Sequence, residues 1–224
     1  GDLRDDHGRL EEPALVVAAA AAVGQIALSQ KYYVNAAFGG GRINVDDITR
    51  SFALGPATET YTADTEGSYR FARIGGGALY SLNDQVRLNP FAHYTWEKVS
   101  IDGFTESNGA ASLSYGDSEY ESKRLTAGLS AIFSPANMEG VVFNLRGSIE
   151  HDFNDDPLVV SLGPDANTLG SVSAPRPDQT WGYISGSVVK EMGSGAFLSL
   201  TGTSSIGLDG SRGFTGAVTY KMSF

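Results

Sequence analysis

One tripeptide has the residue types of an esterase active site. Gly116-Asp-Ser118 repeats the Gly-Asp-Ser order that surrounds the nucleophile of some serine esterases. Such a serine needs a base within reach and an oxyanion hole. Here Glu119-Tyr-Glu121 follows it, and no Asp-x-x-His sequence comes later in the chain. We therefore interpret the tripeptide as a surface loop and predict that this chain is not itself an enzyme.

Metal chemistry has two candidate groups. Asp152, Asp155 and Asp156 could offer clustered carboxylates to calcium, but their spacing is not that of an EF-hand loop. A solvated acidic loop is the preferred interpretation. The histidines are too scattered for a zinc site, and the chain has no cysteine; they are His7, His93 and His151. We predict neither a metal nor a cofactor.

Composition excludes other classes. A formal net charge of −10 argues against a nucleic-acid partner, because phosphate binding needs a basic surface. The 224 residues contain no apolar run of the roughly 18 residues that a membrane helix needs. Gly1–Asp6 is polar and acidic, unlike a signal peptide. We expect either that a leader has been removed or that the natural chain continues upstream.

Alternation with period 2 dominates the chain and predicts β-strands with two different faces. The last strand shows it best. Its apolar set is Phe214, Gly216, Val218, Tyr220, Met222 and Phe224. Its polar set is Thr215, Ala217, Thr219, Lys221 and Ser223. A soluble sandwich also alternates, but these strands run for about 10 to 20 residues, which exceeds the usual globular strand and suits a tilted membrane strand.

In an outer-membrane barrel the apolar face meets lipid and the polar face lines a wet lumen. We expect these charges to face the lumen: Arg73, Arg87, Glu97, Arg124, Arg146, Glu150 and Lys221. His93 would join them, and His151 would lie above the hydrocarbon on the lipid side. The simpler interpretation is that the charges only neutralise one another. We assign to the aromatic girdle Tyr94, Trp96 and Trp181.

The expected strands number nine, at about 10–24, 31–54, 65–82, 86–104, 113–134, 141–155, 177–191, 195–205 and 213–224. Their connections alternate between two lengths. The short ones are Gln25–Gln30, Asn83–Gln85, Pro135–Gly140 and Met192–Ser194. The mostly longer ones are Gly55–Asp64, Thr105–Ser112, Asp156–Arg176 and Ile206–Arg212. Outer-membrane barrels have short periplasmic turns and longer outer loops, which predicts a periplasmic C-terminus.

The whole chain resembles the translocation domain of the autotransporter family, most closely the subgroup with a lipase or esterase passenger. The resembling stretches are Gly8–Leu15, Asp46–Ile48 with Leu54–Thr58, Leu88–Ala92 with Val99–Phe104, Leu113–Asp117, Glu150–Pro157 and Arg176–Trp181. The resemblance implies an antiparallel up-and-down barrel of twelve strands, preceded by a helix in the pore. Nine strands cannot close such a barrel, so we expect residues 1–224 to be its C-terminal part, without the passenger, pore helix and first strands.

By the same resemblance, the domain anchors the passenger in the bacterial outer membrane and helps to translocate it. Its partners would be membrane lipid, its own passenger and the barrel-assembly machinery. That machinery would read the C-terminal residues Tyr220, Met222 and Phe224. Three alternatives stay open: a small porin-like or adhesin-type barrel, a barrel-embedded enzyme that uses His93 or His151, and a soluble β-protein.

Overall fold

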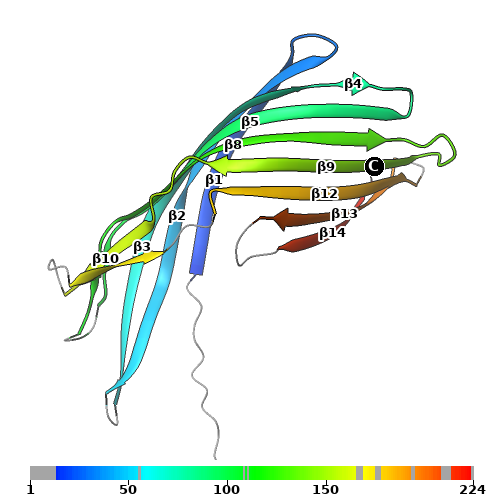
Figure 1. Cartoon of the computed structure of the whole chain (residues 1–224). Helices are drawn as coiled ribbons and strands as arrows, with labels where there is room; N and C mark the ends of the chain where they lie inside the picture. The colour runs from blue at the N-terminus through cyan, green and yellow to red at the C-terminus, as the bar shows by residue number, and fades with distance from the viewer. Residues whose placement is uncertain are drawn as a thin grey trace, which may run out of the picture.

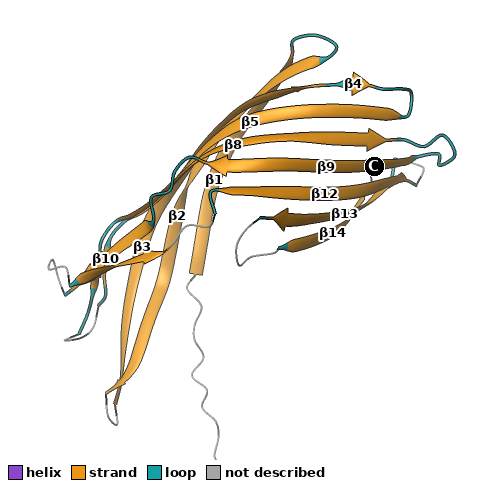
Figure 2. Cartoon of the chain, in the orientation of Figure 1, coloured by secondary structure: helices purple, strands orange, loops and turns teal. Residues whose placement is uncertain are grey.

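The computed structural model describes residues 14–54, 57–107, 109, 111–164, 169–174, 178–192, 195–207 and 213–222, and these residues form only strands, turns and loops. Nine strands follow one another in a single antiparallel sheet, with β4 (Tyr80–Ser81) beside β5 (Figures 1 and 2). The nine are β1 (Ala14–Ala27), β2 (Tyr32–Leu54), β3 (Ala57–Ala78), β5 (Val86–Ile101), β8 (Ser118–Phe133), β9 (Val141–Asp152), β12 (Thr180–Glu191), β13 (Phe197–Ile206) and β14 (Phe214–Lys221). Across the described ranges, no helix is long and apolar enough to cross a membrane.

The register places polar side chains beside polar side chains, and apolar side chains beside apolar ones. Thr95 of β5 lies opposite Arg73 of β3 and Arg124 of β8. One position earlier, Tyr94 lies opposite Leu125. Because successive side chains point to opposite faces of a sheet, a polar face and an apolar face run across all these strands. The all-β antiparallel prediction is confirmed.

The sheet curves toward its polar face (Figure 1). Val23 of β1 and Glu150 of β9 line the same hollow, although β2, β3, β5 and β8 lie between their strands. Such an approach requires the polar face to be concave. We call the polar, concave face the inner face and the apolar, convex face the outer face.

The two ends of the sheet differ. One end, the turn end, holds the short β1–β2, β8–β9 and β12–β13 connections together with the β3–β5 connection that contains β4. The other, the loop end, holds the β2–β3 hairpin and the long connections after β5 and β9. The connections after β5 and β9 are long, as expected, whereas the β2–β3 connection is short.

The loop expected at Gly55–Asp64 is mostly strand, which corrects that prediction. β2 and β3 keep pairing as far as Leu54 and Ala57. The cause lies in the sequence 57–62, which alternates threonine with other residues and contains Tyr61, so its β-propensity is high although it is polar.

This tall hairpin extends away from the main sheet (Figure 1). A β-bulge marks where it departs: Val45 pairs with Thr65 and Ile48 with Ala63, so β2 has one extra residue. The bulge contains Asp47, whose φ is 61° and whose amide donates to the Asp64 carboxylate at 2.9 Å. Bulges bend the strand that carries them and increase its twist.

Four short strands at the loop end were not predicted. β6 (Phe104–Thr105), β7 (Ser114–Tyr115), β10 (Leu158–Gly163) and β11 (Gly170–Ala174) form a second antiparallel sheet in the order β11-β10-β7-β6. β10 and β11 lie in the segment expected to be a loop, Asp156–Arg176, whereas Phe104 and Ser114–Tyr115 fall inside the longer strands expected at 86–104 and 113–134. Strands of two to six residues give too little alternation to be recognised in a sequence.

The sheet has two edges. Within the described ranges, β1 pairs only with β2, and β14 pairs only with β13. The expected number of strands, nine, is thus the number in the main path. The backbone of each edge strand retains unpaired groups along one side.

Candidate functional site on the inner face

All seven charged residues expected to face a lumen lie on the inner face. The register gives this result for each of them: Arg73, Arg87, Glu97, Arg124, Arg146, Glu150 and Lys221. Four of the seven gather around one hollow, whereas Arg87 and Lys221 lie near the turn end and are exposed. Their role beside a water-filled lumen stays a prediction.

The centre of the inner face holds a chain of polar contacts. Arg124 binds the Glu97 carboxylate through Nη2 at 2.5 Å, and its Nη1 lies 3.8 Å from Glu150 Oε2. Beside them, Arg73 Nη2 lies 2.9 Å from His93 Nδ1. These residues come from β3, β5, β8 and β9, so only the folded sheet brings them together. We call them the inner-face cluster.

The inner-face cluster lines a hollow of about 340 Å³. Thr95 and Thr126 add hydroxyl groups to its wall. The Nε atoms of Arg73 and Arg124 are buried and have no hydrogen-bond partner in the described part of the chain. Buried donors without acceptors are costly. The wall of the hollow thus combines guanidinium and hydroxyl donors with the carboxylates of Glu97 and Glu150.

An aromatic residue interrupts the polar pattern of the inner face. Phe91 shares this face with the charges, and the guanidinium of Arg146 lies 4.0 Å from the centre of its ring. Opposite Phe91, Gly128 leaves room for the ring, since a Cβ there would lie 2.5 Å from Phe91 Cζ. The ring thus rests on bare backbone under a cation, which is a favourable cation–π arrangement.

The girdle assignment of Trp181 is wrong. Trp181 lies opposite Glu150, on the inner face, and only 9% of its surface is exposed. The register decides this, because a girdle residue must share the outer face with the lipid-facing side chains. The Trp181 indole Nε1 is buried without a hydrogen-bond partner among the described residues.

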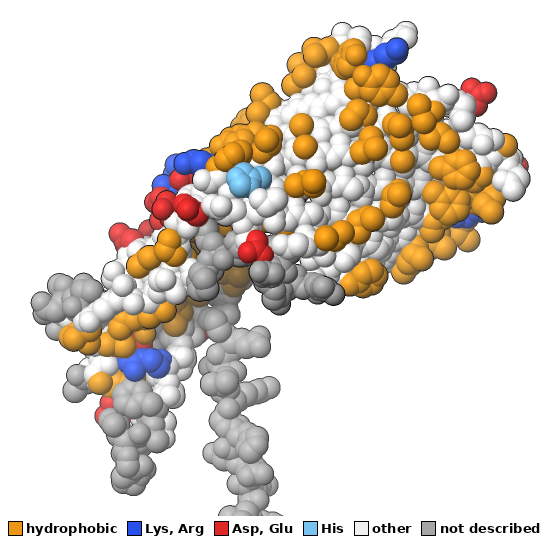
Figure 3. Space-filling model, in the orientation of Figure 1, with side chains coloured by type: hydrophobic (Ala, Val, Ile, Leu, Met, Phe, Trp, Pro, Cys, Tyr) orange, Lys and Arg blue, Asp and Glu red, His pale blue; other side chains and the backbone are white. Residues whose placement is uncertain are grey.

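The outer face carries the apolar residues. Large side chains on it stay exposed, among them Leu145 at 56% and Ile149 at 65%. Figure 3 shows these apolar groups spread over the strands, with charged side chains toward the ends. Tyr94 and Trp96 lie on this face, where the girdle prediction put them. An exposed apolar surface of this extent marks a surface that meets a partner or a membrane.

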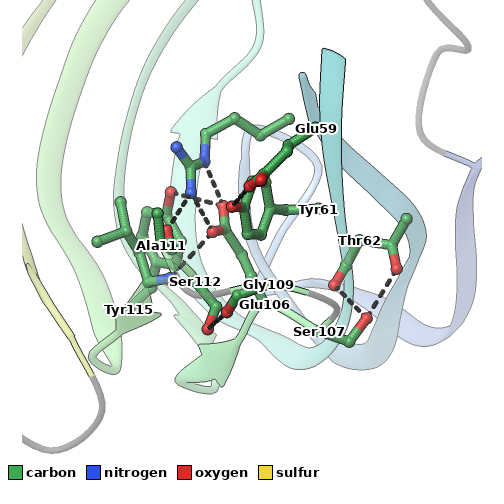
Figure 4. Close-up of polar contacts among 11 residues, drawn as sticks. Glu59, Tyr61, Thr62, Glu106, Ser107, Gly109, Ala111, Ser112 and Tyr115 are labelled. Atoms are coloured by element: carbon green, nitrogen blue, oxygen red, sulfur yellow. Dashed lines mark hydrogen bonds and ion pairs between the residues drawn. The ribbon is translucent and has the colours of Figure 1, made fainter. Parts of the chain in front are cut away.

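The loop end contains a second polar cluster that the sequence did not single out (Figure 4). Arg50 of β2 donates to both carboxylate oxygens of Glu106, through Nε at 2.7 Å and Nη2 at 2.5 Å. The amide of Leu113 also donates to Glu106 at 3.0 Å, and Tyr115 Oη does so at 3.3 Å. The Glu106 side chain is only 4% exposed. We call this arrangement the loop clamp, because it ties the β2–β3 hairpin to the β5–β8 connection.

Electrostatics favour the ionised form of the loop clamp. The hydrogen bonds from the Arg50 guanidinium hold the pKa of the Glu106 carboxyl below its ordinary value, against the opposing effect of burial. Burial beside that carboxylate raises the pKa of the Tyr115 hydroxyl. Thr62 and Ser107 add a second tie, with the Ser107 amide donating to the Thr62 carbonyl at 2.8 Å.

The esterase-like tripeptide has a structural role at the loop end. Asp117 accepts a hydrogen bond from the Gly103 amide at 2.7 Å, and Ser118 begins β8. His93 contacts Arg73, and His151 Nδ1 lies 2.7 Å from Thr180 Oγ1. Across the described ranges, no hydrogen bond joins a serine to a histidine.

Asp152 is not part of a solvated acidic loop. It is 5% exposed, and it accepts hydrogen bonds from Ser122 Oγ at 2.7 Å and from the Lys123 amide at 2.9 Å. The carboxylate therefore fastens the end of β9 to β8. In the described residues, no three acidic, histidine or cysteine side chains are arranged to hold a metal ion.

One solved structure shares this fold, and curated proteins match the sequence of this chain. The translocator domain of the autotransporter NalP from Neisseria meningitidis superposes with a TM-score of 0.66, at 18% identity, over 94% of this chain and 66% of that one. This likeness concerns the fold. Esterase EstA of Pseudomonas aeruginosa and Esterase EstA of Pseudomonas putida are each 34% identical to this chain over 135 residues. That region covers 59% of this chain and 21% of each esterase, so the match spans about a fifth of those proteins.

The family model named Autotransporter beta-domain matches residues 17–203, which run from β1 into β13. The match includes the inner-face cluster, the loop clamp and most of the apolar outer face. The antiparallel strands, the polar concave face and this match agree with one another. The chain belongs to the autotransporter beta-domain family.

Proposed function

We propose that this domain forms part of an outer-membrane barrel that anchors an N-terminally linked passenger and helps to carry it to the cell surface. Membership of the autotransporter family implies an outer-membrane location and a covalently linked passenger. The apolar outer face supports contact with lipid. The match spans only about a fifth of each curated relative, which supports a passenger outside residues 1–224.

The inner-face cluster carries the proposal for translocation. Its hollow is polar, lies on the concave side, and includes two arginine nitrogens without a partner in the described residues. We propose that the segment that joins the passenger to the barrel occupies this hollow. Carbonyl or carboxylate oxygens of that segment would accept hydrogen bonds from Arg73 and Arg124, which would fix it in the lumen.

We further propose that the passenger is an esterase or lipase. The name of the two EstA relatives, at 34% identity, supports this assignment. Ester hydrolysis would then belong to the passenger. The contacts of His93 and Asp117 within the barrel support this division of labour, because both side chains have structural partners.

The proposed orientation places the turn end and the C-terminus in the periplasm. Short turns on that side and long connections on the other support it. Tyr220 and Met222 lie at the C-terminal edge of the sheet, where the barrel-assembly machinery would read them. Phe224, the third residue of that predicted signal, lies outside the described residues.

The first test measures the native polypeptide. An antibody against the last strand is used on outer-membrane fractions, and the band's mass is compared with 23.6 kDa. We expect a much heavier band, and we expect protease added to intact cells to shorten it while the C-terminal epitope survives. A band of 23.6 kDa that stays folded in detergent would instead support a small porin-like or adhesin-type barrel.

A second test addresses the inner-face cluster. In the full-length protein, Glu97→Gln with Arg124→Gln removes the Glu97–Arg124 ion pair and the Arg124 contact with Glu150, and it leaves the net charge unchanged. We expect the passenger to reach the surface several-fold more slowly in a pulse-chase assay, because the lumen loses a donor for the joining segment. The control is Lys31→Gln, an exposed residue in the β1–β2 turn. Unchanged kinetics in a normally assembled double variant would refute the role of the cluster.

A further inference from the structure

A polar hollow lies on the outer face, at the loop-end border of its apolar surface. Ser68, Arg70, Trp96, Lys98 and Ser100 line it, and its volume is about 390 Å³. These residues come from the adjacent strands β3 and β5. The lining combines two cations, two hydroxyl groups and one indole. Cations and hydroxyl donors are the groups with which proteins bind phosphate.

The register brings like charges together in this hollow. Arg70 lies directly opposite Lys98, and Ser68 lies directly opposite Ser100. Like charges at directly opposite positions destabilise a strand pair. Arg42 of β2 adds a third cation, because it lies opposite Ser68, one diagonal step from Arg70. An anion between these side chains would remove the repulsion.

The carboxylates nearby neutralise only part of this charge. Lys98 Nζ lies 2.8 Å from Glu119, which is 57% exposed, so water screens the pair. Glu121 accepts from the Trp96 indole at 2.7 Å and lies 3.0 Å from Lys123. Within the described ranges, neither Arg42 nor Arg70 forms an ion pair. Farther toward the loop end the face becomes acidic, at Asp46 and Glu66, so the positive charge is confined to one level.

The level of the hollow corresponds to the headgroups of a membrane. Lys98 and Leu88 both lie on the outer face of β5, and ten positions separate them. Leu88 lies near the turn end. That stretch is about 33 Å along the strand, and a barrel tilt of about 40° reduces it to about 25 Å, the height of the apolar band in outer-membrane barrels. Arg70 and Lys98 therefore lie where the hydrocarbon ends, and Trp96 lies at the interface, as membrane tryptophans do.

We propose that this hollow binds the phosphate of an anionic lipid headgroup in the membrane leaflet nearest the loop end. Arg70 would hold two phosphate oxygens through its guanidinium, Lys98 would add a point charge, and Ser68 and Ser100 would donate hydrogen bonds. Trp96 would cover the start of the acyl chains. Arg42 would complete the positive field. This assignment rests on the proposed membrane placement of the domain.

Lipid binding to the full-length protein, purified in a neutral detergent, tests the assignment. The probes are bisphosphorylated lipid A, the same lipid without phosphate, and inorganic phosphate. We expect lipid A to bind, the dephosphorylated lipid to bind at least tenfold more weakly, and inorganic phosphate not to displace lipid A at equal concentration. Equal binding of the two lipids, or displacement by inorganic phosphate, would overturn the proposal of a lipid headgroup site.

Two pairs of substitutions separate charge from folding. Arg70→Gln with Lys98→Gln should weaken binding of lipid A by about 25-fold, since each basic residue near an anionic membrane surface accounts for about fivefold. Arg70→Lys with Lys98→Arg should bind about as well as the native protein. Lys31→Gln, at the turn end, is the matched control and should leave binding unchanged. Native affinity in a folded double-glutamine variant would refute the site.

The lipid-binding experiment tests the headgroup site separately from the proposed role in translocation. A protein that fails to reach the outer membrane would contradict the proposed function before any lipid is added. A protein that assembles there and displays its passenger, yet binds both lipids alike, would contradict only the headgroup site. Heat-resistant migration in gels confirms assembly of each variant before its lipid binding is measured.

Discussion

At the scale of single residues, Glu106 shows how a buried carboxylate can fasten surface segments. It receives hydrogen bonds from Arg50 of β2 and from Leu113 and Tyr115 of the β5–β8 connection. Removing a charged partner from such a network leaves the remaining donors unsatisfied. The attachment of the β2–β3 hairpin to the β5–β8 connection therefore depends on the ionised state of the Glu106 carboxyl group.

The loop clamp should release at acidic pH. The pKa of Glu106 is lower in the folded protein than in an open loop. Its contribution to stability is therefore complete above the ordinary carboxyl pKa and is lost as the pH falls through the lowered value. We expect the protection factor of the Leu113 amide, which corrects for the intrinsic pH dependence of exchange, to fall over this acidic range. Glu106→Gln should abolish this pH dependence of the protection factor and lower it by about tenfold at neutral pH; an unchanged protection factor would contradict the role of the carboxylate.

At the scale of elements, the ends of strands are held by specific side chains. Asp152 closes the loop end of the β8–β9 pair by accepting from Ser122 and Lys123 of the neighbouring strand. The same carboxylate also holds the next segment, since the Asn154 amide donates a hydrogen bond to it at 3.1 Å. The pair therefore ends in a defined arrangement rather than in a frayed turn.

Asp152→Ala should loosen this end of β9. It leaves the Lys123 amide without its acceptor, at a cost of about 2 kcal/mol. We expect the urea midpoint of the detergent-solubilised domain to fall and exchange at Lys123 to rise. Asp155→Ala, three positions later in the exposed connection, should have no measurable effect on either quantity. Equal effects of the two substitutions would contradict the assigned role.

The sequence predicted the main strands well, because most of them alternate over many residues, although β1 is an almost continuous apolar run. The second sheet was missed because β6 and β7 have two residues each and lie among polar residues. The Gly55–Asp64 prediction failed because polar composition was taken to indicate a loop, although threonine and tyrosine favour strands. Alternation identifies strands that cross a membrane better than strands that extend beyond it.

The candidate site was predictable as a face, but its contacts were not. Period 2 placed Glu97 and Arg124 on the polar side, whereas only the register reveals that they touch. For Trp181, the sequence pattern did not reveal even the face of the sheet. Both faces of β12 carry apolar residues near its end, Val188 and Val189, so the pattern alone does not decide which face the indole occupies.

At the scale of the whole molecule, the sheet is strongly curved but has two free edges in the described ranges. β1 and β14 each donate and accept hydrogen bonds with a single neighbour. The central strands β5 and β8 are paired on both sides. Protection of the backbone should therefore vary strongly across the sheet.

Hydrogen exchange on residues 1–224 in detergent measures this variation. We expect amides of β1 and β14 that point away from their neighbours to exchange within minutes, and those of β5 and β8 to stay protected for hours or longer. The reason is that edge amides without a partner remain open to water. Strong protection along both edge strands would mean that β1 and β14 pair with each other or with another chain.

The apolar outer face also has a fixed length, which can be compared with the thickness of a bilayer's hydrocarbon layer. Its length between the turn end and the Arg70–Lys98 level is fixed by hydrogen-bonded strands, which cannot stretch. A bilayer whose hydrocarbon layer is thicker must thin locally around the protein, or else cover these two cations with acyl chains, at a cost that grows with every ångström of mismatch. Bacterial outer membranes are thinner than average. The same strands that surround the lumen therefore bias the protein energetically toward the membrane whose thickness they match.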